Sequence, residues 1–316
     1  MSQHEPASDR PATSRHYLVS TDELAALLAE HASNEQTDAR RRAIVVLDAT
    51  VLPVAGFDGH PSYVTGDEQY LVSGHIPGAV FADLISAFSD PDAPRPFTRP
   101  DAVRFASAAA ALGIKSATSV VVYDAAIGQW AARLWWLFRS FGHDDVAVLD
   151  GGLRKWEAED RPIEVGHVAP IEAAGFGAVE RGEFWADKQR VLQAVSGEAP
   201  ATLVCGIPPR EFTGEAGHRQ RLGHIPGSFS APAARLVDRE TNAFLSDDAL
   251  REVLADVVAS PDPIVAYCAA GIAATSDALA LAVLGRDDVS VYDGSLNEWA
   301  ADAEAPLVLS AHPPVE

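Results

Sequence analysis

The chain contains one set of short motifs twice, in the same order. Residues 74–78 read G-H-I-P-G, and residues 223–227 repeat them. Each copy then has an apolar run that ends in a tyrosine, Tyr123 in the first and Tyr267 in the second. Each copy closes with V-x-D-G followed by a tryptophan, Trp156 in the first and Trp299 in the second. Repeats this long are domains with their own cores, and 316 residues suffice for two of them. The sequence therefore predicts a duplicated domain.

Short apolar runs alternate with helical patterns in both copies. Buried strands are expected at residues 43–47, 120–123, 146–149, 202–205, 264–267 and 289–292. Helices are expected at residues 21–29 (after a capping box at Ser20–Glu23), 100–112, 129–141, 188–195, 246–258 and 273–284. Residues 50–73 and 83–100 have the composition of long loops. This alternation indicates an α/β fold of two tandem domains, each a mostly parallel sheet flanked by helices.

Composition sets the expected domain boundaries. Residues 1–16 are polar and contain proline, which predicts a disordered tail. The first domain is expected at 17–156 and the second at 177–316. Residues 157–176, charged and then rich in Pro, Gly and Ala, are expected to be a linker.

The formal net charge of −21 argues against nucleic acid and anionic membrane surfaces as partners. No apolar run approaches the roughly 18–20 residues of a membrane span, and the first residues lack the apolar stretch of a signal peptide. The two cysteines, Cys205 and Cys268, do not make a disulfide framework, so a cytoplasmic location is expected. No nucleotide loop or metal-ligand cluster is visible, and neither a cofactor nor a metal is expected.

The two copies differ at the residue after the tyrosine, which is Asp124 in the first and Cys268 in the second. Small residues and a glycine follow Cys268, and then a helix is expected to begin at Ala273. Backbone amides and a helix N-terminus in such a turn stabilise an anion, and the thiolate is the nucleophilic form of cysteine. A lone cysteine is often only a small buried apolar side chain. This context favours a nucleophile instead.

In their order and duplication these motifs resemble the tandem-domain rhodaneses, the thiosulfate and 3-mercaptopyruvate sulfurtransferases, over residues 17–308. The resemblance implies an inactive first copy, with Asp124 at the cysteine position. It implies a second copy in which Cys268 becomes a persulfide and passes the outer sulfur to a nucleophile. It also implies that backbone amides hold the substrate anion and the persulfide, at Ala269, Ala270, Gly271, Ile272, Ala273 and Ala274.

The loop departs from both subtypes of that family. Thiosulfate-type loops carry cationic side chains after the cysteine, whereas this loop has alanines. Mercaptopyruvate-type loops read C-G-S-G-V, with the serine proposed to work with the histidine of the first G-H-I-P-G. Here His75 matches that histidine, but Ala270 replaces the serine. A neutral loop that keeps Gly271 is nearer the mercaptopyruvate type.

A second departure lies on the strand before the second G-H-I-P-G. The family's usual Asp-x-Arg is replaced by Cys205 and Ile207. An arginine in the stretch that follows grips the carboxylate in mercaptopyruvate enzymes, and Arg219 and Arg221 are the favoured candidates here. The role of Cys205, including pairing with Cys268 under oxidation, stays open.

The predicted activity is transfer of a sulfane sulfur from 3-mercaptopyruvate or thiosulfate to a thiol, cyanide or a thioredoxin-like protein. One alternative is a non-catalytic sulfur-carrier or binding module, although retention of Cys268 favours an enzyme. A cysteine-dependent phosphatase would need an arginine at position 274, where this chain has alanine. Both histidines of the repeated motif, His75 and His224, have a second interpretation as braces of the turn.

Overall fold

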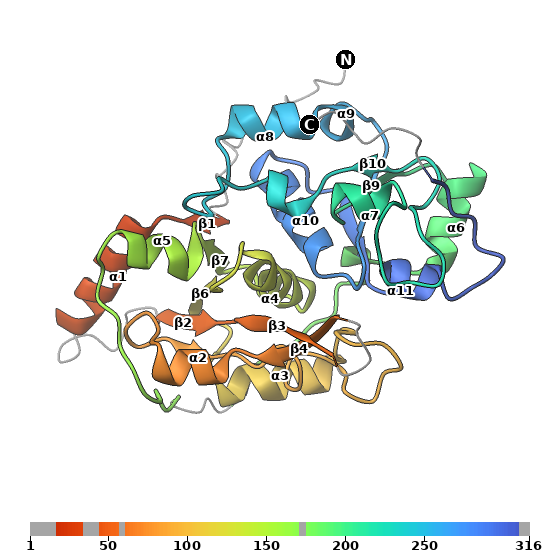
Figure 1. The fold of residues 1–316 in the computed structure, drawn as a ribbon. Helices are drawn as coiled ribbons and strands as arrows, with labels where there is room; N and C mark the ends of the chain where they lie inside the picture. Colours follow the sequence, from red (N-terminus) through yellow and green to blue (C-terminus); the bar gives the residue numbers. More distant parts are fainter. Residues whose placement is uncertain (1–16, 34–43, 57–60, 171–174, 310–316) are drawn as a thin grey trace, which may run out of the picture.

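The computed structural model describes residues 17–33, 44–56, 61–170 and 175–309, which form two α/β domains, each on a five-stranded sheet (Figure 1). Every strand pair in both sheets is parallel. The predicted fold class is confirmed. The tail expected at 1–16, the last residues 310–316 and residues 171–174 of the expected linker lie outside the described residues.

The first sheet has the strand order β1-β7-β6-β2-β5. Its strands are β1 (Leu18–Val19), β2 (Ile44–Asp48), β5 (Val80–Phe81), β6 (Ser119–Tyr123) and β7 (Val146–Leu149). Its helices are α1 (Thr21–Ser33), α2 (Asp67–Val72), α3 (Ala102–Ala111), α4 (Gln129–Ser140) and α5 (Gly152–Ala158).

The second sheet repeats this order as β8-β12-β11-β9-β10. Its strands are β8 (Trp185–Ala186), β9 (Thr202–Cys205), β10 (Phe229–Ser230), β11 (Ile264–Tyr267) and β12 (Val289–Tyr292). Its helices are α6 (Lys188–Ser196), α7 (Pro209–Phe212), α8 (Asp247–Val253), α9 (Ala255–Val258), α10 (Ala273–Val283) and α11 (Ser295–Trp299), with short 3₁₀ turns at Gly182–Phe184 and Ala233–Arg235. The matching order confirms that a single domain has been duplicated.

The strands β7, β9, β11 and β12 have the predicted bounds, because each is a short β-rich run between turn residues. The capping box is also present. Ser20 Oγ accepts from the Glu23 amide at 3.2 Å, and Glu23 Oε2 accepts from the Ser20 amide at 2.8 Å. The helix expected at residues 246–258 is divided in two at Leu254.

The long loop expected at residues 50–73 is wrong. Strand β3 (Val51–Ala55) pairs antiparallel with β4 (Pro61–Thr65) in a separate two-stranded ribbon, and α2 follows. Pro53 lies in β3, and proline in a strand usually counts against strand assignment. A ribbon of two edge strands tolerates it, since each strand has one side without a ladder. Most of the ribbon's described residues are exposed, so the alternation of buried and exposed positions that predicts a strand is weak.

The repeated motifs meet in space at the same place in both domains. The hydroxyl of Tyr123 accepts from the Ile76 amide at 3.2 Å, and that of Tyr267 accepts from the Ile225 amide at 3.0 Å. Each tyrosine at the end of a central strand therefore braces a G-H-I-P-G turn.

The motif tryptophans hold the chain that leaves each domain. Trp156 Nε1 donates to the Pro162 carbonyl, and Trp299 Nε1 donates to the Pro306 carbonyl, both at 2.8 Å. The segments beyond them form antiparallel bridges with the histidines of the two turns, His75 with Glu164 and His224 with Val308. The duplicated motifs thus close each domain on itself.

Helices α4 and α10 lie at the centre of the molecule, where they pack against each other between the domains (Figure 1). Residues 130–140 of α4 and 274–282 of α10 are buried all round, and the apolar core runs through both domains. None of the helices described here is long and apolar enough to cross a membrane.

The first glycine of the second G-H-I-P-G turn gives a test of this closure. Gly223 has φ +103°, and a Cβ there would lie 2.2 Å from the Val308 carbonyl oxygen. Gly223→Ala should lower the free energy of unfolding by about 3 kcal/mol, because both backbone strain and a backbone clash result. Gly227→Ala is the control, at φ +78° with no atom within 4 Å of the added carbon. It should cost only about 1 kcal/mol in urea denaturation. Equal losses would contradict the packing argument.

Candidate active site

Cys268 lies where the buried strand β11 ends, and five residues later α10 begins. Cys268 is only 2% exposed, and the two residues that follow, Ala269 and Ala270, are half-buried. The cysteine therefore stands at the carboxyl edge of a parallel sheet, which is where such sheets bind ligands.

The loop that carries Cys268 is held from behind by the segment at the start of α11. The hydroxyl of Ser295 accepts from the amides of Cys268 and Gly271, both at 3.1 Å, and donates to the Tyr292 carbonyl at 2.7 Å. The amides of residues 296 and 297 donate to the carbonyls of residues 268 and 269, at 3.1 and 3.0 Å. The Gly271 amide is thus already engaged, which corrects its predicted part in holding substrate.

A buried arginine from the first domain also supports this loop. Arg133 of α4 is 1% exposed, and its guanidinium donates to the Gly271 carbonyl at 3.2 Å and the Phe97 carbonyl at 2.8 Å. It forms an ion pair of 2.7 Å with Asp293, whose other carboxylate oxygen accepts from the Arg99 amide. The first domain therefore fixes the position of the loop in the second.

The equivalent loop of the first domain shows what such a turn holds. The carboxylate of Asp124, at the position of Cys268, accepts four backbone hydrogen bonds of 2.8–3.0 Å, from the amides of Ala126, Gly128, Trp130 and Ala131. Complete burial raises the pKa of Asp124, and these amide donors oppose that rise. The amides of this loop thus converge on an acceptor carried by the loop itself.

A tyrosine from the β3–β4 ribbon reaches the neighbourhood of the cysteine. The ring of Tyr63 makes edge contacts with Phe97 at 5.4 Å and Trp130 at 5.5 Å. Burial raises the pKa of its phenol, and the charges of Cys268 and Glu211 raise it further. Sequence reasoning missed Tyr63 because it placed the whole segment in a loop.

The predicted cations separate into two kinds of position. Arg219 forms an ion pair with Glu211 at 2.9 Å. The charge of Glu211 also raises the pKa of Tyr63, as does the charge of Cys268. The Nε of Arg219 is buried without a hydrogen-bond partner among the described residues. Arg221 instead donates to the carbonyls of Asp302 and Ala305, so it binds the chain after α11.

The histidines of the two turns occupy bracing positions. His75 is fully buried and stacked on Tyr70 at 4.0 Å, and both of its ring nitrogens face backbone carbonyls. His224 stacks on Phe212 at 3.6 Å in the same way. The structure does not bring His75 to the mouth of the Cys268 loop.

Comparison with known proteins agrees with these features. The rhodanese-like domain profile matches twice, at residues 64–159 and 208–302. The chain belongs to the rhodanese-like domain family. The 3-mercaptopyruvate sulfurtransferase of Escherichia coli (strain K12) is 36% identical over 243 residues, covering 76% of this chain and 85% of that protein. The thiosulfate sulfurtransferase of Gallus gallus is 32% identical over 257 residues, covering 80% and 85%.

A solved relative has the same fold. The crystal structure of SseA from Escherichia coli, a 3-mercaptopyruvate sulfotransferase with the rhodanese fold, aligns with a TM-score of 0.73 and 32% identity, covering 89% of this chain and 98% of that one. The predicted enzyme class, a sulfurtransferase, is confirmed by these relatives.

The other cysteine of this rhodanese-like protein, Cys205, is held neutral. Cys205 is fully buried, and burial raises the pKa of its thiol from 9.0 to about 12. Cys205 pairs with Tyr267, the residue before Cys268, in the strand register, and both cysteines are free. Burial also raises the pKa of Asp277 well above its usual range. Burial therefore disfavours negative charge on both of these groups.

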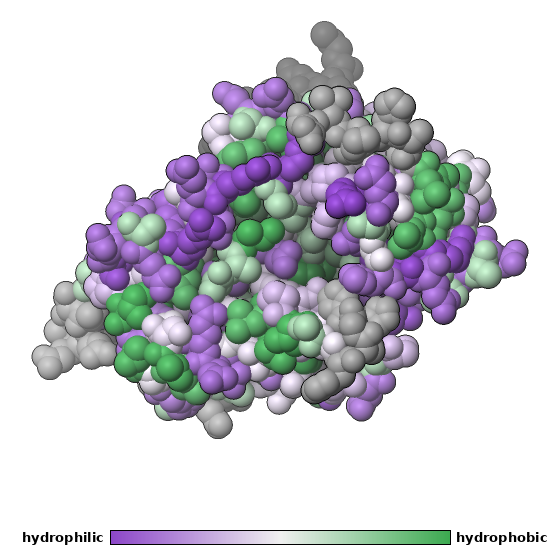
Figure 2. Space-filling model, viewed as in Figure 1, coloured by the Kyte–Doolittle hydropathy of each residue, from purple (hydrophilic) through white to green (hydrophobic). Residues whose placement is uncertain are grey.

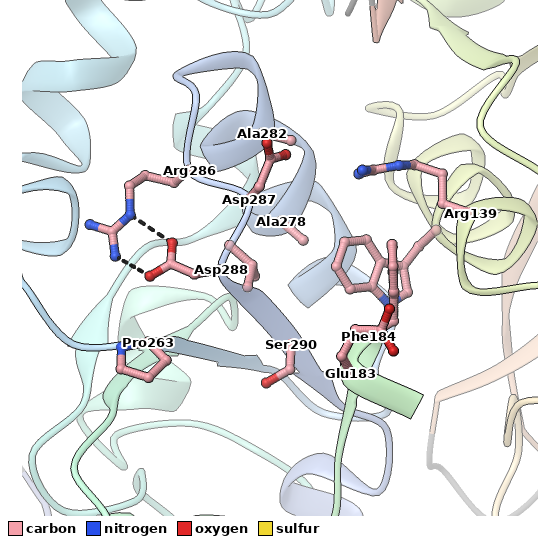
Figure 3. Close-up of a pocket in the computed structure, with 12 residues that line it drawn as sticks. Arg139, Glu183, Phe184, Pro263, Ala278, Ala282, Arg286, Asp287, Asp288 and Ser290 are labelled. Carbon is pink, nitrogen blue, oxygen red and sulfur yellow. Dashed lines mark hydrogen bonds and ion pairs between the residues drawn. The ribbon is translucent and has the colours of Figure 1, made fainter. Parts of the chain in front are cut away.

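A cavity of about 360 Å³ between the domains is separate from this site (Figure 3). Arg139 and Phe184 line one side and the ion-paired Arg286 and Asp288 the other. Its floor includes Pro263 and Ser290, at the amino-terminal edge of the second sheet. Cys268 lies at the opposite edge. The surface view also shows the molecule hollowed where the two domains meet (Figure 2).

The arginine behind the loop gives a test of the interdomain support. Arg133→Met should destabilise the protein by about 3 kcal/mol in urea denaturation, because it leaves the Asp293 carboxylate largely buried without its partner. Turnover should also fall, because the Gly271 carbonyl loses its donor. Arg251→Met is the control, since this half-exposed arginine pairs only with surface carboxylates. It should change stability by less than about 0.5 kcal/mol. Similar losses in both variants would argue against the proposed support.

Proposed function

We propose that this protein transfers a sulfane sulfur through a persulfide on Cys268, with 3-mercaptopyruvate as the preferred donor. The observation that carries the proposal is the paired loops. The first-domain loop directs four amides at the Asp124 carboxylate, and a loop at the same place in the second domain carries a cysteine. A turn of this kind stabilises a thiolate and then the terminal sulfur anion of a persulfide.

The first half-reaction moves one sulfur atom. The Cys268 thiolate attacks the sulfur of 3-mercaptopyruvate, an S–S bond forms and the C–S bond breaks, with its electron pair going to the pyruvate enolate. The proton on the donor's sulfur is released as the persulfide anion forms, and one proton is taken up at the enolate carbon to give pyruvate. The products are a cysteine persulfide anion and pyruvate. An acceptor thiolate or cyanide then attacks the outer sulfur and restores Cys268.

The first domain has no nucleophile of its own in this scheme. The Asp124 carboxylate fills the centre of its loop, so no substrate anion can enter. The contribution of that domain is support, through Arg133 under the catalytic loop and the β3–β4 ribbon at its mouth. The domain boundaries at 17–156 and 177–316 remain part of this proposal.

Charge near the loop favours 3-mercaptopyruvate. Thiosulfate is a compact dianion that gains from cations beside the sulfur. Ala269 and Ala270 supply none, and Arg133 is already paired with Asp293. Mercaptopyruvate separates its carboxylate from its sulfur, and we propose that the Arg219 guanidinium, which pairs with Glu211 at 2.9 Å, binds that carboxylate. The amides proposed to hold the sulfur anion are those of residues 269, 270, 272, 273 and 274.

The acceptor in this proposal is a thiol, either a small molecule or a thioredoxin-like protein, and cyanide is a convenient substitute in assays. A persulfide enzyme with two free cysteines suits a reducing compartment, and we place it in the cytoplasm.

The persulfide can be seen directly. After incubation with 3-mercaptopyruvate, intact-mass spectrometry should show one added sulfur atom that cyanide removes. Cys268→Ser should abolish both the adduct and turnover. Cys205→Ser is the matched control and should keep both, because the Cys205 thiol is buried and protonated at neutral pH. An adduct that maps to Cys205 would overturn the assignment.

Donor preference has its own test. The wild-type kcat/KM should be higher with 3-mercaptopyruvate than with thiosulfate. Ala270→Lys puts a cation beside the sulfur and should raise kcat/KM for thiosulfate relative to mercaptopyruvate by about tenfold, which corresponds to about 1.4 kcal/mol. Ala102→Lys, in the first turn of α3 and outside the loop, is the control and should leave the ratio unchanged. A wild-type enzyme that already prefers thiosulfate would refute the charge argument.

A further inference from the structure

The β3–β4 ribbon holds one polar side chain near the catalytic cysteine. Tyr63 lies in β4, opposite Pro53 in the antiparallel register. The end of the ribbon is fixed, because the Gly66 amide donates to the Thr50 carbonyl at 2.9 Å and Thr65 Oγ1 donates to Asp67 at 2.6 Å. The Tyr63 ring rests on Phe97 and Trp130. Its position is therefore defined by the ribbon and by two aromatic contacts.

The same aromatic group is tied to the catalytic loop. Arg133 donates both to the carbonyl of Phe97 and to the carbonyl of Gly271. The surface under Tyr63 and the loop that carries Cys268 thus share one buried guanidinium. The charge of Cys268 is also felt at the Tyr63 phenol. Tyr63 therefore lies on the first-domain side of the Cys268 loop, one aromatic contact away from the carbonyl that shares Arg133 with Gly271.

Cleavage of the C–S bond in mercaptopyruvate is favoured by a hydrogen-bond donor at the keto oxygen. As the sulfur leaves, negative charge develops on that oxygen in the enolate. Donors directed at such an oxygen lower the barrier because they are already oriented when the charge appears. The side chains of residues 269–273 are alanine, glycine and isoleucine and carry no proton to donate.

Other nearby hydroxyls are already engaged. Tyr267 OH donates to Ser228 and accepts from the Ile225 amide. The Ser295 hydroxyl donates to the Tyr292 carbonyl. Both lie beneath the loop rather than at its mouth. Tyr63 is 42% exposed. Its contacts with Phe97 and Trp130 are made by its ring and leave its hydroxyl available.

We propose that the Tyr63 hydroxyl donates a hydrogen bond to the keto oxygen of the donor substrate and stabilises the enolate that forms when Cys268 takes its sulfur. This inference rests on the proposed sulfurtransferase function. The phenol stays un-ionised at neutral pH, since burial and the nearby negative charges raise its pKa. It acts as a hydrogen-bond donor, and the proton that completes pyruvate arrives at the enolate carbon.

The role predicts a loss that depends on the donor. Tyr63→Phe keeps the ring and its two aromatic contacts and removes only the hydroxyl. With 3-mercaptopyruvate, kcat/KM should fall about 100-fold, mostly through kcat. With thiosulfate, whose leaving group is sulfite and not an enolate, it should fall less than about threefold. Tyr17→Phe is the matched control, because the Tyr17 hydroxyl donates to Asp287 at 3.4 Å and accepts from Arg139 at 3.3 Å. Asp287 lies just before β12, at the end of the second sheet opposite to Cys268. The Tyr17→Phe variant should leave both donors unchanged.

The possible results separate the two proposals. A wild-type enzyme that forms no persulfide with any donor refutes the proposed function itself, and with it this role. Wild-type turnover with an unchanged Tyr63→Phe variant overturns the role of Tyr63 alone. Equal losses with both donors overturn it as well, because they would show that the hydroxyl supports the loop or the cysteine. A selective loss with 3-mercaptopyruvate supports it.

Discussion

The ion pair between Arg133 and Asp293 is the contact on which the arrangement of the site depends. A guanidinium that is 1% exposed is costly to bury unless its donors are used, and Arg133 uses them on a carboxylate and two carbonyls. One of those carbonyls belongs to Gly271, in the loop that carries Cys268. The domains therefore cannot shift against each other without leaving a buried charge uncompensated. This requirement explains how a domain without a nucleophile remains part of the site.

The two domains share one fold because they arose by duplication. They differ at the loop after the central strand, which carries Asp124 in the first domain and Cys268 in the second. In both, a tyrosine hydroxyl braces the G-H-I-P-G turn and a tryptophan holds the departing chain. The first loop saturates its own amides with the Asp124 carboxylate, which makes it a closed structural element. The second carries Cys268 and obtains its support from outside, through Ser295 and Arg133. The same geometry is thus structural in one copy and available for chemistry in the other.

The groups buried next to the Cys268 loop have raised pKa values, which disfavours negative charge there. Burial raises the pKa of the Cys205 thiol to about 12 and raises the pKa of Asp277 well above its usual range. Tyr267 is also held un-ionised, because burial raises its pKa well above the usual range. Burial therefore disfavours negative charge on all three of these groups. In the proposed mechanism, Arg219 supplies a cation and the Tyr63 hydroxyl supplies a hydrogen-bond donor to the substrate. This division suits a substrate with a carboxylate and a keto group apart from its sulfur.

The sequence by itself determined the duplicated α/β fold, the central strands and Cys268 as the candidate nucleophile. These follow from local signals, namely apolar runs of strand length, caps and a cysteine between a strand and a helix start. It did not reveal the β3–β4 ribbon, whose exposed strands lack a clear alternation, or the site roles of Tyr63 and Arg133. It also named His75, which is fully buried, and Arg221, which binds the chain just after α11. Only tertiary structure decided these positions, because side chains from distant segments share a site when two domains pack together, and no local pattern encodes that packing.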